Sequence, residues 1–156
     1  MRLVRGILSA MPLALWLLAG CTSATPSYQE PAAGSASAAT VFIGGLTEQY
    51  SVSQNKSWIQ IVAVDGKATG HVQSVRVPSG EHQFTIRHHD PYGTFYGNAR
   101  YADIKFKAEA GSRYRIDASY KGGFYLGQFD LVATDEQSGN QIAHTLPASK
   151  QRLTGP

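Results

Sequence analysis

The chain has little of several features that mark particular classes of protein. Its 156 residues include one cysteine, so no disulfide bond can form within the chain. Beyond residue 20, no apolar pattern repeats at the 3.6-residue period of a helix, which argues against a helical fold. The apolar run at residues 7–18 is interrupted by Ser9 and Pro12 and is too short to span a membrane. These absences leave a β-structured domain as the expectation.

The charge of the chain is also low. It has 14 Lys and Arg residues against 11 Asp and Glu residues. Arg2 and Arg5 lie in the first 20 residues, which contain no acidic residue. Removal of that segment therefore lowers the number of Lys and Arg residues from 14 to 12 and leaves a net charge of about +1. The basic character of the precursor is therefore no argument for nucleic acid, and we expect no nucleic-acid partner.

Catalytic motifs are missing as well. The sequence has no nucleophile elbow, no glycine-rich phosphate loop and no Ser, His and Asp in the context of a triad. Asp65, Asp90 and Asp117 are too scattered to suggest acid and base roles. We therefore expect a protein that is not an enzyme and that carries no cofactor.

The first 21 residues have the organisation of an export signal. A basic start with Arg2 and Arg5 precedes the apolar run, which closes at Leu18-Ala19-Gly20-Cys21. This sequence resembles a bacterial lipobox, in which small residues precede the cleaved bond and the cysteine thiol takes the lipid. The resemblance implies that Cys21 becomes a lipidated N-terminus with stable attachment to a membrane, since two or more acyl chains anchor a protein firmly. Thr22, by the sorting rule of Gram-negative lipoproteins, implies the outer membrane, with the anchor facing the periplasm.

The composition then divides the chain into four parts. We expect a lipoprotein signal peptide (1–20), a lipidated N-terminus with a flexible tether (21–39), a β-sandwich domain (40–146) and a polar tail (147–156). The tether is rich in Ala, Ser, Thr, Pro and Gly and has no periodicity. As a random coil its 18 residues after Cys21 would span about 20–25 Å.

Residues 75–87, V-R-V-P-S-G-E-H-Q-F-T-I-R, carry the strongest structural signal. Apolar and polar residues alternate on both sides of Pro78-Ser79-Gly80, which predicts strand, turn and strand. Residues 104–108 and 113–120 alternate in the same way. Further strands are expected at 40–44, Trp58–Val64, 71–77, 127–134 and 141–145. The spacing predicts an all-β fold, a single antiparallel β-sandwich of about seven to eight strands.

Three segments together resemble a family of small domains. They are V-D-G-K at 64–67, V-R-V-P-S-G-E-H-Q-F-T-I at 75–86 and I-K-F-K-A-E-A-G-S-R-Y-R-I at 104–116. They are similar to the PEGA-like and transthyretin-like β-sandwich modules of bacterial envelope lipoproteins, although the Pro-Glu-Gly-Ala sequence itself does not occur. The resemblance implies an accessory binding or scaffolding module rather than a catalyst.

An aromatic segment is the best candidate for a binding site. Tyr92, Phe95 and Tyr96 lie in a turn-rich stretch that ends at Arg100 and Tyr101. Exposed rings beside an arginine are typical of surfaces that stack on a glycan or a peptide. The alternative is that the rings fold back and close the end of the sandwich.

Two other clusters of polar residues have a possible role. His82, His88 and His89, with Asp90, are metal-ligand types, but alternation directs His88 and His89 to opposite faces, so no metal site is expected. The basic residues of 104–116, expected on two adjacent strands, suggest a stripe for anionic lipid, or a solvated polar face; they are Lys105, Lys107, Arg113 and Arg115.

Three functions are consistent with these signals. The first is a membrane-anchored, non-enzymatic module that binds or braces another envelope protein through loops or an edge strand. The second is a glycan- or peptidoglycan-binding module that uses the aromatic segment from Tyr92 to Tyr101. The third, which the spacing disfavours, is a metal protein or enzyme built on His82, His88 and His89.

Overall fold

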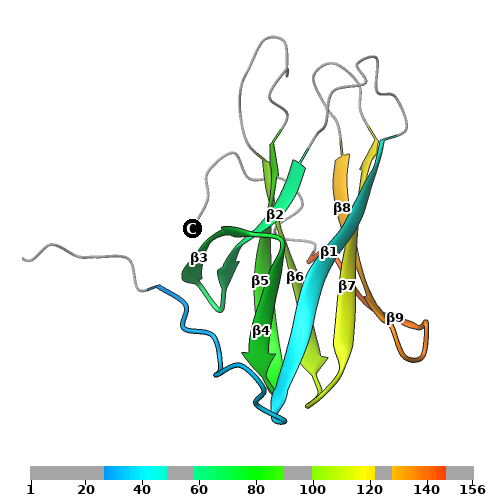
Figure 1. The fold of residues 1–156 in the computed structure, drawn as a ribbon. Helices are drawn as coiled ribbons and strands as arrows, with labels where there is room; N and C mark the ends of the chain where they lie inside the picture. The colour runs from blue at the N-terminus through cyan, green and yellow to red at the C-terminus, as the bar shows by residue number, and fades with distance from the viewer. Residues whose placement is uncertain (1–26, 49–57, 90–99, 122–127, 147–156) are drawn as a thin grey trace, which may run out of the picture.

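The computed structural model describes residues 27–48, 58–89, 100–121 and 128–146 (Figure 1). The signal segment with the lipobox, the aromatic residues before Arg100 and the tail after Leu146 lie outside the described residues. Within the described part there are nine strands, and no helix there is long and apolar enough to cross a membrane.

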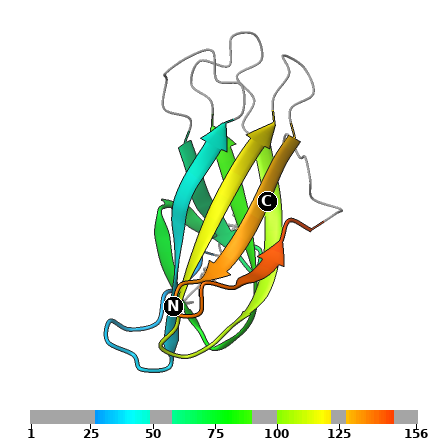
Figure 2. The ribbon, with the colours of Figure 1, turned by 90° about the vertical axis from the view of Figure 1, so that its right-hand side faces the viewer.

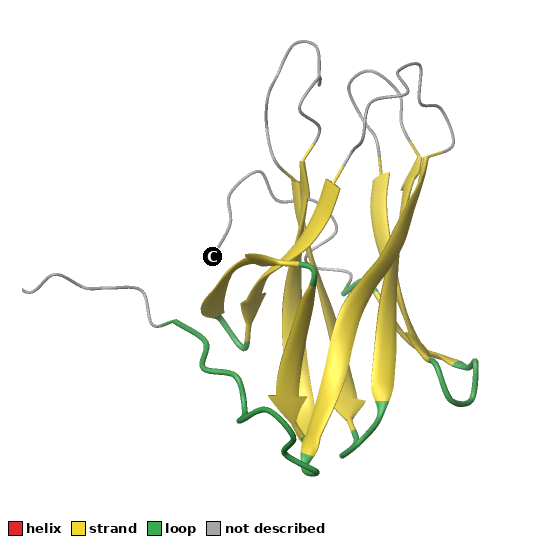
Figure 3. Ribbon diagram, in the orientation of Figure 1, coloured by secondary structure: helices red, strands yellow, loops and turns green. Residues whose placement is uncertain are grey.

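The strands form two sheets that pack face to face (Figures 1 and 3). Sheet A has the order β3 (Lys67–Val72), β2 (Trp58–Val64), β5 (Gly80–His89) and β6 (Arg100–Ala108). Sheet B has the order β4 (Ser74–Pro78), β1 (Ala38–Glu48), β7 (Arg113–Lys121), β8 (Gln128–Asp135) and β9 (Gln141–His144). The prediction of an all-β sandwich is confirmed. Its ladders are antiparallel except that β1 runs parallel to β7.

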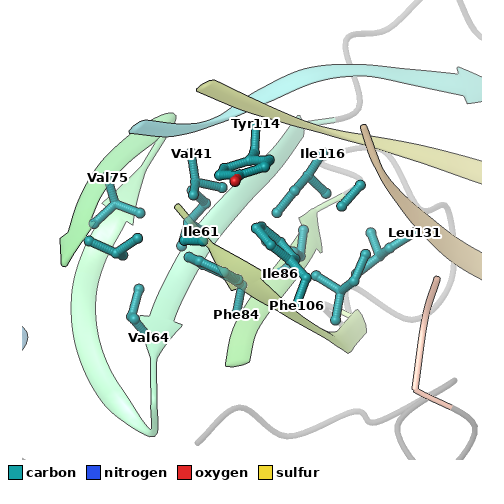
Figure 4. Close-up of a cluster of buried hydrophobic side chains, with 14 of the residues drawn as sticks. Val41, Ile61, Val64, Val75, Phe84, Ile86, Phe106, Tyr114, Ile116 and Leu131 are labelled. Atoms are coloured by element: carbon teal, nitrogen blue, oxygen red, sulfur yellow. The ribbon is translucent and has the colours of Figure 1, made fainter. Parts of the chain in front are cut away.

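The core lies between the sheets and follows the alternation of the sequence (Figure 4). Phe84 and Ile86 of β5, Ile104 of β6 and Ile116 of β7 are fully buried, as the period-2 pattern predicted. Phe106 stacks on Phe84 with ring centroids 4.9 Å apart, and Tyr114 lies 5.2 Å from Phe106. Burial of each large apolar side chain contributes about 1.5–3 kcal/mol, so this cluster supplies most of what holds the sheets together.

Two tight turns connect strands of different sheets. The turn at Pro78–Gly80 is present, but it leads from β4 in sheet B to β5 in sheet A, so these strands do not pair. The turn at Gly111 likewise leads from β6 in sheet A to β7 in sheet B. The expectation that Lys105 and Arg113 lie on adjacent strands is therefore wrong. Alternation fixes which side chains point inward, and it does so equally for strands that pair and for strands that face each other across a core.

The predicted strand at 71–77 is divided. The backbone turns at Gly70 and His71, which both have positive φ, and the chain leaves sheet A for sheet B around Gln73. The Gln73 side chain donates a hydrogen bond to the carbonyl of Ile59, 3.0 Å away, at this crossing. The division raises the strand count to nine, and it places β3 and β4 at neighbouring edges of the two sheets.

The first strand is longer than predicted. Gly44 and Gly45 were expected to end it, but β1 continues through a bulge to Glu48. At Gly44 a Cβ atom would collide with the side chains of Arg115 and Asp117, which belong to the neighbouring strand β7. Glycine here permits a close approach of charged side chains and does not break the strand.

Candidate functional site

One end of the sandwich carries the boundaries of the predicted aromatic site. Register pairs Trp58 with His89, His88 with Arg100, and Lys121 with Gln128, and these strand ends gather at the same end of the molecule (Figures 1 and 2).

Of the five predicted ligand-binding residues, Tyr92, Phe95 and Tyr96 lie outside the described residues. Arg100 and Tyr101 begin β6, and Tyr101 is half-buried opposite Arg87 on the outer face of sheet A. The aromatic site therefore stays a prediction.

The two β5 histidine residues whose side chains the structure describes, His82 and His88, lie apart from each other. His82 is buried, its Nδ1 lies 2.7 Å from Asp65 Oδ2, and its Nε2 donates to the carbonyl of Pro78 at 2.9 Å. Because Nε2 is occupied, it cannot take a proton from a nucleophile as a catalytic base must. The other oxygen of Asp65 accepts from the Gln83 amide at 2.9 Å. This pair instead fixes the turn after β2 to the start of β5.

His88 also points inward, as the alternation predicted, and it is buried. It follows His82 by six residues, which is about 20 Å along a strand, so the two cannot share an ion. The side chain of His89, and Asp90, lie outside what the structure describes. In the described residues, no three His, Cys, Asp or Glu side chains are grouped as metal ligands would be.

A buried polar pair joins β5 to β6 and had no sequence signal. Thr85 and Asp103 occupy facing positions on the outer face of sheet A, and the Thr85 hydroxyl donates to Asp103 Oδ1 at 2.8 Å. Both residues are at most 5% exposed. Thr85 belongs to the polar set of its strand, which the alternation places on the face away from the core. Only the cross-strand register brings Thr85 and Asp103 together.

Three of the four residues of the predicted basic stripe, Lys105, Arg113 and Arg115, form ion pairs with acidic side chains. Arg115 lies 2.9 Å from Asp117, and Arg113 lies 3.3 Å from Glu136, on the outer face of sheet B. A shallow depression of about 310 Å³ beside Arg115 and Asp117 is lined by polar and apolar residues alike, among them Ser119 and Val132. On sheet A, a hydrogen bond from Lys105 lowers the pKa of Glu81. These contacts favour the solvated polar face over a lipid-binding stripe.

The side of the sandwich between β3 and β4 is closed by Tyr28. The Tyr28 amide donates to the carbonyl of Ala68 on β3 at 2.8 Å. Its hydroxyl donates to the carbonyl of Arg76 on β4, also at 2.8 Å, and its ring packs against the core. One residue therefore joins the edge of sheet A to the edge of sheet B. We call these contacts the Tyr28 clasp.

The opposite side, between β6 and β8–β9, is closed only in part. Thr145 is buried there; its amide donates to the carbonyl of Leu131 at 3.0 Å, and its hydroxyl accepts from the Leu131 amide. Thr145 also forms a bridge to Ile104 of β6, and the Leu146 amide donates to the Asp103 carbonyl at 2.8 Å. Further along β6, towards Ala108, no strand of the described part covers this side.

A groove of about 280 Å³ occupies the uncovered part. We call it the edge groove; it is lined by Phe106, Lys107, Glu109, Tyr114, Asp135 and Ile142. Its floor is aromatic, because Phe106 and Tyr114 are 6% and 3% exposed and belong to the core stack. Ile142 is 39% exposed, the one large apolar side chain so exposed among the described residues. The rim carries charges of both signs.

The main chain of β6 is available beside this groove. The Asp103 carbonyl points away from β5, since it accepts from Leu146. In an antiparallel ladder alternate residues direct their N–H and C=O groups to the same side, so Lys107 also points them outward. The register with β5 runs from Gly80 to His88 without a shift, which keeps that alternation intact. At Lys107, a strand edge that no described strand covers thus lies next to a groove with an aromatic floor.

Sequence reasoning did not find the edge groove. Ile142 lies in the short final strand, and its alternation with Gln141 gave no sign that it faces outward across a gap. No protein-family model, curated protein or solved structure matches this chain.

Proposed function

We propose that this protein is an outer-membrane lipoprotein, anchored through Cys21, whose β-sandwich is a non-enzymatic binding module for another envelope protein. The module takes up an extended segment of that partner at the edge groove. The segment adds as a strand to β6 and places an apolar side chain over Phe106, beside Ile142. The observation that carries the proposal is the outward-facing main chain of Lys107, which no described strand covers, next to a groove floored by Phe106 and Tyr114.

Strand addition suits this edge for a chemical reason. Main-chain hydrogen bonds to β6 give affinity for any extended segment, and the groove selects the side chain that enters it. Charges of both signs on the rim disfavour a strongly acidic or basic segment. The lysine residues of β6 are also typical of edges protected against unspecific association, which limits pairing to a partner that fits the groove.

Two resemblances support the same class of function: that of residues 18–21 to a bacterial lipobox, and that of the segments within 64–116 to PEGA-like and transthyretin-like modules of envelope lipoproteins. The polar contacts of His82 and Asp65 serve the fold, which leaves no reacting group at that pair. The proposal accordingly assigns no cofactor and no catalytic residue.

Photo-crosslinking in cells tests the binding surface. A photoreactive amino acid replaces Lys107 on β6 or, as the matched control, Lys67 on β3. We expect a discrete crosslinked product from position 107, with the partner peptide found by mass spectrometry, and none from position 67. Addition of Ile142→Glu should remove the product. Equal products from both positions, or a product insensitive to Ile142→Glu, would refute the edge groove as the binding surface.

The anchor has its own test. Cys21→Ala should leave an unprocessed precursor without lipid, whereas the unchanged chain should gain the mass of a diacylglycerol and an acyl chain and fractionate with the outer membrane. A mature protein of unmodified mass would contradict the lipoprotein assignment.

Peptidoglycan binding through Tyr92, Phe95, Tyr96, Arg100 and Tyr101 is the second candidate. Its support is that Arg100 and Tyr101 start β6 at the end of the sandwich where the flanking strands converge. If it holds, Tyr92→Ala with Tyr96→Ala abolishes binding to purified sacculi and leaves the fold intact, while Ile142→Glu has no effect on that binding.

A further inference from the structure

We infer that the Tyr28 clasp orients the domain on the membrane, with the β3 side towards the bilayer and the edge groove away from it. This inference rests on the proposed anchor at Cys21. It adds a membrane-facing side to the domain and explains how a short anchored module keeps its binding side accessible.

The first step is the fixed length of chain between the domain and Cys21. Residues 27–37 belong to the expected tether, yet they lie against the domain (Figure 1). Ser27 bridges to Ala68, the Arg76 side chain lies 3.3 Å from Glu30, and the Ser37 carbonyl accepts from the Ser79 amide at 3.1 Å. The segment is thus attached at its start and at its end.

The second step is the reach that remains. Only the six residue steps from Cys21 to Ser27 separate the proposed lipid from the first residue that is held against the domain. We call this connection the leash. As a coil, six residues span about 12–15 Å, and fully extended they reach about 20 Å. The tether expected from the sequence, with 18 residues, would have allowed about 20–25 Å even as a coil.

The third step is the size of the domain that must turn. Strand β3 and strand β6 are the two edges of sheet A, three strand spacings or about 14 Å apart. To bring the β6 side down to the bilayer, the leash would have to cross that width and then clear the rim of the sandwich. Crossing about 14 Å takes up the whole coil length of about 12–15 Å and most of the extended length of about 20 Å, which disfavours that orientation, whereas the six residues reach the bilayer directly from the β3 side.

The fourth step is the placement of the edge groove. Strands β3 and β9 lie on opposite sides of the molecule (Figures 1 and 2), and the groove includes Ile142 of β9. An anchor leaving from Ser27 therefore directs the groove towards the periplasm. The same arrangement holds the outer edge of β3 close to lipid.

The test uses the single cysteine of the chain. Cys21 is blocked by its lipid, so an introduced cysteine is the sole free thiol and takes a fluorophore. The lipidated full-length protein carries the label at Lys67→Cys, in β3, or at Gln137→Cys, in the turn before β9; both positions are exposed. It is placed in vesicles of phosphatidylethanolamine and phosphatidylglycerol that contain nitroxide-labelled headgroups.

We expect quenching at position 67 to exceed quenching at position 137 by about threefold or more, since the leash holds only the first within its reach of the bilayer. Tyr28→Ala should reduce the difference. Because that variant also loses stability, a second one inserts a flexible Gly-Ser segment between Cys21 and Ser27 and leaves the clasp intact; it too should reduce the difference.

Equal quenching at the two positions, in protein whose mass shows the lipid, would overturn the orientation and leave the proposed anchor standing. Protein without lipid in the same mass measurement would overturn the anchor and the orientation together. A difference between the two positions that the Gly-Ser insertion does not change would also overturn the orientation, because the length of the leash would then play no part.

Discussion

The two sheets leave a gap on each side of the sandwich, and the two gaps are closed by different residues and to a different extent. Between β3 and β4, a residue from outside both sheets hydrogen-bonds to each of them and packs its ring on the core. Between β6 and β9, Thr145 and Leu146 close the gap only along the first part of β6. The closed side carries the chain towards the proposed anchor at Cys21, and the other side leaves a groove beside a stretch of β6 that no described strand covers. On the proposed function, stability and binding therefore belong to opposite sides of the sandwich.

Tyr28→Ala tests the closed side most severely. The variant loses the ring packed against the core and the hydrogen bond to the Arg76 carbonyl, so the free energy of unfolding should fall by about 2–3 kcal/mol. Denaturant unfolding measures the change. A loss below about 0.5 kcal/mol, the range of ordinary surface substitutions, would show that the clasp does not hold the sheets together.

Thr145→Val tests the closed part of the other side. The substitution keeps the shape and removes the hydroxyl, which leaves the buried Leu131 amide without its acceptor. The free energy of unfolding should fall by about 1–2 kcal/mol. Thr134→Val is the matched control, because that threonine faces outward on β8 and makes no comparable buried contact in the described residues; it should unfold like the unchanged protein.

Tyr28→Phe separates the hydrogen bond of the clasp from its packing. We expect a loss of about 1 kcal/mol near neutral pH. Burial, with Asp65 and Glu30 nearby, raises the pKa of Tyr28 above its ordinary value of 10.0. The stability from the neutral hydroxyl is therefore complete below pH 10 and is lost as the pH rises through the folded pKa.

Unfolding midpoints measured from pH 8 upward test this pH dependence. They are compared between the unchanged protein and Tyr28→Phe. The gap between them should narrow at alkaline pH. If the difference between the two midpoints stays constant while the tyrosine residues titrate, the hydrogen bond from the Tyr28 hydroxyl does not stabilise the folded protein in solution.

Ile142→Ser should have the smallest effect on stability and sharpens the comparison most. Ile142 is partly exposed and closes no gap, so the free energy of unfolding should change by less than about 0.5 kcal/mol. Crosslinking from position 107 should nevertheless weaken. A large loss of stability would mean that Ile142 belongs to the core and that the groove is only a packing defect.

Much of the sandwich could be predicted from the sequence. Alternation at Ile104, Phe106 and Ile116 fixed the strands and their inward faces, and the run of β2, apolar except at Gln60, is typical of the interior strand that it forms. These signals are local, because each strand must bury every second residue whatever it pairs with.

The arrangement of the strands could not be predicted in the same way. Tight turns such as those at Gly80 and Gly111 need the same residue types whether the next strand pairs with the previous one or crosses to the other sheet. The close approach of Arg115 and Asp117 that requires Gly44 depends on a strand some 70 positions further along. The same is true of the candidate site: Tyr28 meets Ala68 and Arg76, and Ile142 meets Phe106, only through the fold.

Amide hydrogen exchange at Tyr28 and Lys107 tests the contrast between the two sides most directly. The Tyr28 amide donates to the Ala68 carbonyl, and the Lys107 amide points away from β5, towards a side that no described strand covers. We predict slow exchange at Tyr28 and fast exchange at Lys107 in the isolated protein, with Lys107 becoming protected when the crosslinked partner segment is added as a peptide. Fast exchange at Tyr28, or protection at Lys107 before any partner is present, would contradict the assignment of a closed, anchored side and an open, binding side.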